Sequence, residues 1–159
     1  MVAVAVEVDT KKVQDELAAL AKEYGKATVD AAVTSAHLVR SEAIKSIQSA
    51  SMGTQVIRHT TTGQPYNHVA AKPGAAPNTD TGALVNSIQV EGDSGGLFGQ
   101  RARGIFVGTR LAYGAWLEFG TKAMLARPWL WPALDRKRDE IRKIFGKKID
   151  KITRDNQNL

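Results

Sequence analysis

Few residues in this chain have the type and spacing that chemistry needs. The sequence contains no cysteine, which removes thiol nucleophiles, disulfides and thiolate metal sites. Two of its three histidines, His59 and His68, lie nine residues apart in a polar stretch, and no third ligand has converging spacing. His37 has neither histidine nor carboxylate four residues further on. We therefore expect no metal site and no cofactor.

One tripeptide, Asp80-Thr81-Gly82, matches the segment that carries the catalytic carboxylate of aspartic proteases. That chemistry needs two carboxylates that share a proton, and a tripeptide held at the end of an apolar strand. Here the residues before it, 76–79, read Ala-Pro-Asn-Thr and are loop-like. We expect a structural role instead, in which Asp80 or Thr81 caps a turn and Gly82 takes an unusual backbone angle before a strand begins.

Glu118 is the other carboxylate with distinctive surroundings. It stands between Leu117 and Phe119, so partial burial is expected, and a buried carboxylate needs hydrogen-bond donors. We expect these donors to be backbone N–H groups of the turn at Gly120. No second group for catalysis is evident beside it. The chain also has no P-loop and no dinucleotide fingerprint, so the sequence predicts a protein that is not an enzyme.

Positive charge gathers toward the C-terminal end. The formal net charge is +6, and nine lysines and arginines between 136 and 154 oppose only three acidic residues. Such a helix can contact phosphates in a salt-dependent way, although a solvated amphipathic face is the commoner meaning of a charge run. The candidate phosphate contacts are Arg142, Lys143 and Lys147.

Periodicity indicates the elements in the first half of the chain. Alternating valines predict a short strand at 2–8, and spacings of three and four predict a long helix over 11–49, which Gly25 kinks or divides. Residues 50–82 are rich in Gly, Pro, Ser, Thr and Asn, and we expect a long loop there. Loops of that length are usually functional or are ordered by a partner.

In the second half, residues 84–90 and 104–108 predict two strands of an antiparallel hairpin with its tip at 91–103. One or two helical turns follow at 113–117, with Gly120 as a left-handed C-cap. Pro132 suits the first turn of a last helix, and 155–159 is expected to be a loose tail. The apolar face of that helix comprises Leu130, Leu134, Ile141, Phe145, Ile149 and Ile152.

Together these elements predict one α+β domain over residues 1–159, a small antiparallel sheet flanked by a long N-terminal and a C-terminal helix. Residues 113–134 hold all three tryptophans and are expected to anchor the core through Trp116, Leu117, Leu130 and Leu134. No apolar run approaches the roughly 20 residues of a membrane span, so a cytoplasmic product is expected.

Two separated motifs stand out along the chain. The first motif comprises Pro73, Gly74, Pro77, Thr81, Gly82, Leu84 and Ser87. The second comprises Tyr113, Glu118, Phe119, Gly120, Thr121, Arg127, Pro128 and Pro132. In order and spacing these motifs resemble the tail-completion (head–tail joining) proteins of long-tailed bacteriophages, and the resemblance covers about residues 11–145. Trp129 stands where that family usually has Phe, and Gly114 where it usually has Ala.

The resemblance implies a virion structural protein. Such proteins form a ring, often of six copies, between the head-connector or stopper protein and the tail terminator or tail tube, and genome DNA passes through the lumen. It implies assembly in the bacterial cytoplasm, localisation at the phage neck and no membrane. Loop 50–82 and the hairpin tip would contact neighbouring subunits, the connector or the tail. Two alternatives stay open: a tail-terminator ring protein, and a non-specific nucleic-acid-binding protein that uses the basic C-terminal helix.

Overall fold

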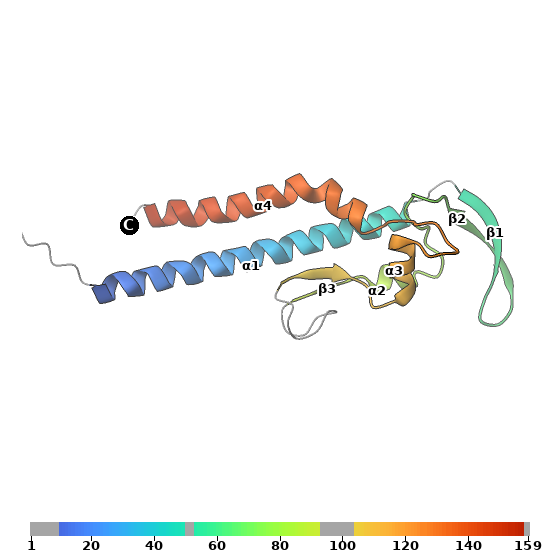
Figure 1. Ribbon diagram of the computed structural model, residues 1–159, viewed down its shortest axis with the longest axis horizontal. Helices are drawn as coiled ribbons and strands as arrows, with labels where there is room; N and C mark the ends of the chain where they lie inside the picture. The colour runs from blue at the N-terminus through green and yellow to red at the C-terminus, as the bar shows by residue number, and fades with distance from the viewer. Residues whose placement is uncertain (1–9, 50–52, 93–103, 158–159) are drawn as a thin grey trace, which may run out of the picture.

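The computed structural model describes residues 10–49, 53–92 and 104–157. The strand predicted at 2–8 and most of the hairpin tip lie outside these ranges. The described residues form an α+β fold (Figure 1). Its elements are α1 (Thr10–Gln48), β1 (Gly53–His59), β2 (Pro65–Ala71), α2 (Ala83–Ser87), β3 (Gln89–Glu91), β4 (Phe106–Gly108), α3 (Ala112–Phe119) and α4 (Trp131–Gln157).

Helices α1 and α4 run antiparallel and form a long arm (Figure 1). The 39 residues of α1 span about 58 Å at 1.5 Å per residue. Near one end of the pair, the hydroxyls of Tyr24 and Thr153 hydrogen-bond at 2.9 Å, and near the other Arg136 Nε donates to Glu42 Oε1 at 2.8 Å. Ala31 is fully buried, so the seam is made partly of small side chains. Gly25 does not divide α1.

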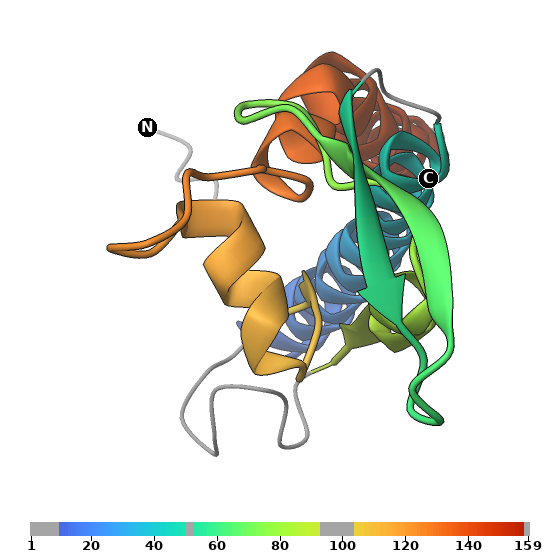
Figure 2. The same ribbon diagram turned by 90° about the vertical axis from the view of Figure 1, so that its right-hand side faces the viewer.

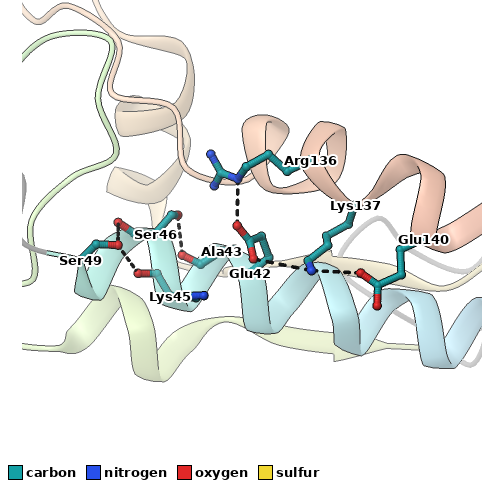
Figure 3. A network of polar contacts seen from close by, with 8 residues as sticks. All are labelled: Glu42, Ala43, Lys45, Ser46, Ser49, Arg136, Lys137 and Glu140. Carbon is teal, nitrogen blue, oxygen red and sulfur yellow. Dashed lines mark hydrogen bonds and ion pairs between the residues drawn. The ribbon is translucent and has the colours of Figure 1, made fainter.

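The polar contacts at the inner end of the arm are drawn in Figure 3. Glu42 of α1 lies between two basic residues of α4, at 2.8 Å from Arg136 Nε and 4.0 Å from Lys137 Nζ. Lys137 also pairs with Glu140 at 3.0 Å. These contacts join α4 to α1 near the core end of the arm. Neither of the long helices, over the residues that the structure describes, has a window apolar enough to cross a membrane.

The main core lies where α1 meets the short elements, at the end of the arm that carries the strands. Trp129 is the largest side chain among its buried members, and 2% of its surface is exposed. Trp116, predicted to be a core residue, is 55% exposed, so that prediction was wrong. Leu117, Leu130 and Leu134 are half-buried against the core. Its buried members are Val39, Ala43, Ile47, Leu84, Val85, Ile88, Trp129 and Ala133.

The long loop predicted at 50–82 is wrong for much of its length. Strands β1 and β2 pair antiparallel from Gly53↔Ala71 to His59↔Pro65. The turn between them closes through the N–H of Thr60, which donates to the carbonyl of Gln64 at 2.9 Å. The strands show no clean alternation of polar and apolar residues, since Val56 and Ile57 are adjacent and residues 69–71 are a run of three. Residues 72–82 are irregular, as expected.

The hairpin predicted from residues 84–90 and 104–108 is confirmed, with one change. Strand β3 pairs antiparallel with β4 in the register Gln89↔Gly108. The preceding residues, expected to extend the strand from 84, form the helical turn α2. Leu84, Val85 and Ile88 have i, i+1, i+4 spacing, which puts all three on the core side of a helix, and all three are buried.

Helix α3 confirms the predicted turn and extends it. Gly120 ends it with φ 76° and ψ −179°, a positive φ as predicted but with extended rather than left-handed helical ψ. A Cβ there would lie 2.9 Å from the carbonyl oxygen of Met124, so glycine is required. Pro132 lies in the first turn of α4 as predicted. The helix continues to Gln157, so the loose tail predicted at 155–159 is wrong for 155–157.

Candidate functional site

The carboxylate of Glu118 caps the start of α4. Its Oε2 accepts the backbone N–H groups of Trp129 at 2.7 Å and Leu130 at 2.9 Å, and its Oε1 accepts that of Trp131 at 2.8 Å. The first N–H groups of a helix have no partner within it and form the positive end of its dipole, so a carboxylate is well matched to them. The donors expected in the Gly120 turn instead lie 11 to 13 residues further along the chain.

Arg127 joins this cap to the strands. Its backbone N–H donates to the carbonyl of Leu117 at 2.7 Å, and its Nε donates to the carbonyl of Ala71 at the end of β2 at 2.9 Å. The N–H of Gly74 donates to the carbonyl of Ala126 at 2.9 Å. The two sequence motifs therefore meet in one place. We name this hydrogen-bonded unit the corner, defined by Ala71, Gly74, Leu117, Glu118 and residues 126–131.

Within the first motif, Pro73 and Gly74 form a tight turn. The N–H of Ala75 donates to the carbonyl of Lys72 at 3.1 Å, and Gly74 has φ 82°, the positive angle that the third residue of a type II turn requires. At the other end of this motif, Ser87 Oγ lies 2.6 Å from Thr109 Oγ1, which links α2 to the segment before α3. These motif residues thus set backbone geometry and packing.

Trp129 and Gly114, where the sequence departs from the motifs it resembles, contact one another. Trp129 Nε1 donates to the carbonyl of Gly114 at 3.1 Å in the buried interior, a hydrogen bond that Phe cannot make. A Cβ on residue 114 would lie 2.4 Å from Thr109 Cγ2 and 3.3 Å from Leu84 Cδ1. Alanine at 114 would therefore need a neighbouring side chain to move.

Asp80 ties the β1–β2 hairpin to the body of the protein. Its Oδ1 accepts from Tyr66 Oη at 2.7 Å and lies 3.6 Å from His68 Nδ1, while its Oδ2 accepts from Arg58 Nη1 at 3.0 Å. The turn cap is supplied by Thr81, whose Oγ1 accepts from the N–H of Ala83 at 3.4 Å. The hydrogen bond to Asp80 is the main cause of the raised pKa of Tyr66.

A cavity of about 420 Å³ lies between the hairpin, residues 77–85 and α3. Asp80 is the one carboxylate among the described residues that line it, so the second carboxylate of a protease is not present in this cavity. Tyr113 also lines it, and burial followed by the negative charge of Asp80 raises its pKa. Arg58 and His68 of the hairpin lie on one wall, and Leu84, Val85 and Leu117 contribute to the apolar part.

The histidines do not converge on a metal site. Strand alternation places His68 on the face of the hairpin that carries Arg58 and Tyr66, and His59 on the other face. His37 is exposed on α1. In the ranges that the structure covers, no group of three or more histidines and carboxylates could hold a metal ion.

An exposed apolar surface covers the outer side of α3, which sequence reasoning missed. Phe119 is 83% exposed and Trp116 55%. We name Ala112, Ala115, Trp116 and Phe119 the α3 face; all four are exposed. Their i, i+3, i+4, i+7 spacing was visible in the sequence, but Tyr113 and Leu117 form a second apolar stripe on the same helix. The sequence alone therefore did not indicate which stripe faces the core. Two further large apolar side chains are exposed, Trp131 within the corner and Leu125 just before it in sequence.

The basic residues of α4 divide into two sets. Arg142 pairs with Asp139 at 3.1 Å. Lys143, Lys147 and Lys151 are exposed and recur every four residues, which places them in one stripe. Within the described ranges, none of these three lysines forms an ion pair, whereas Arg136, Lys137, Arg138 and Lys148 do.

Comparisons of the chain with protein-family models, with curated proteins and with solved structures gave no match.

Proposed function

We propose that the protein is a non-enzymatic component of a phage neck, where copies form a ring that joins the head connector to the tail. The observation that carries this proposal is the corner. Two motifs that resemble those of tail-completion proteins lie 26 residues apart in sequence, from Ser87 to Tyr113, yet they meet where the N–H of Gly74 donates to the carbonyl of Ala126 and Arg127 Nε donates to that of Ala71. Their residues hold a rigid junction, which is what a shared structural role requires.

The carboxylates support a structural assignment. Glu118 is engaged by three backbone N–H groups, and Asp80 by the side chains of Arg58 and Tyr66. Both therefore act as acceptors in contacts that join separate elements of the fold. The α3 face adds a second argument, because contiguous exposed apolar side chains typically mark a surface that binds another protein.

Electron microscopy of phage particles tests the proposal. In a phage whose genome encodes this chain, deletion of the gene should leave DNA-filled heads and separate tails, and purified protein should restore joining. A ring at the head-proximal side of the neck favours the tail-completion role, while one at the end of isolated tails favours the tail terminator. If particles that lack the protein still joined heads to tails normally, both the tail-completion role and the tail-terminator role would be ruled out.

The unpaired lysine stripe favours a second candidate, non-specific binding of duplex DNA. Charge reversal of Lys143, Lys147 and Lys151 should abolish binding, and the wild-type affinity should fall by orders of magnitude between low and moderate salt. Reversal of Arg138 and Arg142, which are paired with Asp135 and Asp139, is the matched control. Equal effects of the two sets, measured by fluorescence anisotropy, would contradict a site on this stripe.

A further inference from the structure

The α3 face has the composition of a protein interface. Helix α3 carries one charged residue, Glu118, and the corner uses it. The face itself therefore presents only alanine, tryptophan and phenylalanine to solvent. Exposed tryptophan and phenylalanine side chains of this kind are the residues that dominate interface energetics.

The outer side of the β1–β2 hairpin is a second exposed surface on the same chain. Strands β1 and β2 form a two-stranded sheet, and such a hairpin is marginally stable without a further layer. We name Gln55, Ile57, Asn67 and Val69 the outer hairpin face, since the register places them on one side of the sheet. All four are exposed, Ile57 at 69%. The opposite side carries Arg58, Tyr66 and His68 toward Asp80.

The two surfaces are turned away from one another. The inner side of the hairpin, through Arg58 and His68, and one side of α3, through Tyr113 and Leu117, line the same cavity. The outer hairpin face is on the reverse of the sheet, and the α3 face lies about 130° around its helix from the cavity side. Figure 2 shows α3 and the hairpin on opposite sides of the end of the arm.

We propose that the outer hairpin face of one copy packs on the α3 face of the next copy, in a head-to-tail contact. Two different surfaces that point away from each other cannot both be satisfied in a two-fold dimer, but they can be satisfied in a ring or filament. Both surfaces are uncharged, and the amides of Gln55 and Asn67 provide a polar rim. The inference builds on the proposed function by naming the contact between copies.

The exposed area suits such a contact. Large buried side chains remove roughly 150–250 Å² each, so the exposed parts of Trp116, Phe119 and nearby Leu125 amount to on the order of 400 Å². A standard interface buries about 800 Å² per partner, of which the centre is mostly apolar. These three side chains could therefore supply that centre.

Two variants and their mixture test the contact by analytical ultracentrifugation over a concentration series. Trp116→Lys with Phe119→Lys removes the α3 face, and Ile57→Lys with Val69→Lys removes the outer hairpin face. All four positions are exposed, so circular dichroism should show unchanged folding. Leu17→Lys, at a position 60% exposed on α1, is the matched control.

We expect the wild type and the Leu17 control to self-associate and each double variant to associate more than about tenfold more weakly. An equimolar mixture of the double variants should form a one-to-one dimer, because each supplies the surface that the other lacks. Self-association of the hairpin variant would instead show α3 faces pairing with each other. The inference would be overturned by any one of three results: self-association of the hairpin variant, a mixture that stays monomeric, or a wild type that stays monomeric.

The outcome is separable from the neck proposal. If the copies do not associate through these surfaces but the protein still restores head–tail joining, the inference fails and the proposed function stands. If the mixture dimerises but joining does not depend on the protein, the contact stands and the neck role fails.

Discussion

At the scale of single residues, Glu118 does more for the architecture than any other side chain in the corner. One carboxylate from α3 satisfies three consecutive N–H groups at the start of α4. It thereby replaces the Ser, Thr, Asn or Asp cap that helices usually carry just before their first turn. The direction in which α4 leaves the corner depends on this contact.

Glu118→Gln should destabilise the protein by about 2–3 kcal/mol, because the amide keeps one acceptor oxygen, loses the charge and turns an NH₂ group toward backbone donors. Urea unfolding measures the loss. Glu140→Gln is the control, since Glu140 is exposed and paired only along the surface with Lys137, where a change within about 0.5 kcal/mol is expected. Similar losses in the two variants would contradict the capping role.

Gly114→Ala should destabilise by about 1–2 kcal/mol, although alanine favours helix. The new Cβ would meet Thr109 Cγ2, and Thr109 is held in place because its Oγ1 hydrogen-bonds with Ser87 Oγ and accepts the backbone N–H of Leu111. Thermal unfolding measures the change.

Two further variants make the Gly114 prediction specific. Gly25→Ala, where nothing lies within 4 Å of the added Cβ, should stabilise by up to about 1 kcal/mol. Thr109→Ser keeps the hydroxyl and deletes Cγ2, so it should recover most of the loss when combined with Gly114→Ala. No recovery would show that the crowding lies elsewhere.

Tyr66 should titrate above its ordinary pKa of 10.0. Its hydrogen bond to Asp80 raises the pKa most, burial and the charge of Asp80 add to this, and Arg58 opposes it. Because the folded pKa exceeds the unfolded one, the stabilising contribution is complete below about pH 10 and is lost as pH rises through the folded pKa. Tyrosinate absorbance in a Tyr24→Phe, Tyr113→Phe background measures it, and adding Asp80→Asn should move the pKa back toward 10.0.

At the scale of elements, hydrophobic periodicity predicted α1, α3, α4 and the β3–β4 hairpin, because each has a repeating apolar side. It failed for β1–β2, because the apolar residues there do not alternate with polar ones: Val56 and Ile57 are adjacent, and residues 69–71 are a run of three. It also chose Trp116 over Trp129 for the core. An eight-residue helix with apolar residues on both sides does not reveal which side faces inward. The donors to Glu118 could not be inferred, since they depend on how 120–128 folds back.

Asp80→Ala should loosen the β1–β2 hairpin selectively. Arg58 and Tyr66 lose their shared acceptor, and a two-stranded sheet has little stability of its own. Hydrogen–deuterium exchange should quicken over 53–71 while the core residues 39–47 keep their protection. Asp139→Ala, which removes an exposed pair with Arg142, should leave hairpin exchange unchanged. Equal protection of the hairpin in wild type and Asp80→Ala would contradict the view that Asp80 stabilises the hairpin.

At the scale of the whole molecule, packing is uneven. The main core gathers at one end, and the far part of the arm is held by a thin seam with few buried residues, among them Ala31 and Ile152. The α3 face and the outer hairpin face, through which we propose that copies associate, both lie at this better-packed end. The arm extends away from them, so the proposed contact would leave the lysine stripe accessible.

This uneven packing predicts that arm and core respond separately to a change in the seam. Ala31→Leu adds bulk where no surface is exposed, and overpacking typically costs about 1–3 kcal/mol. We expect exchange to quicken in 14–30 and 148–157, which lie beyond the core, while residues 84–88 and 129–134 stay protected. Val29→Leu, on the exposed side of α1, is the control and should change neither region. Uniform loss of protection throughout would instead mean that the arm and the core unfold as one cooperative unit, and that the seam contributes to the stability of the binding surfaces.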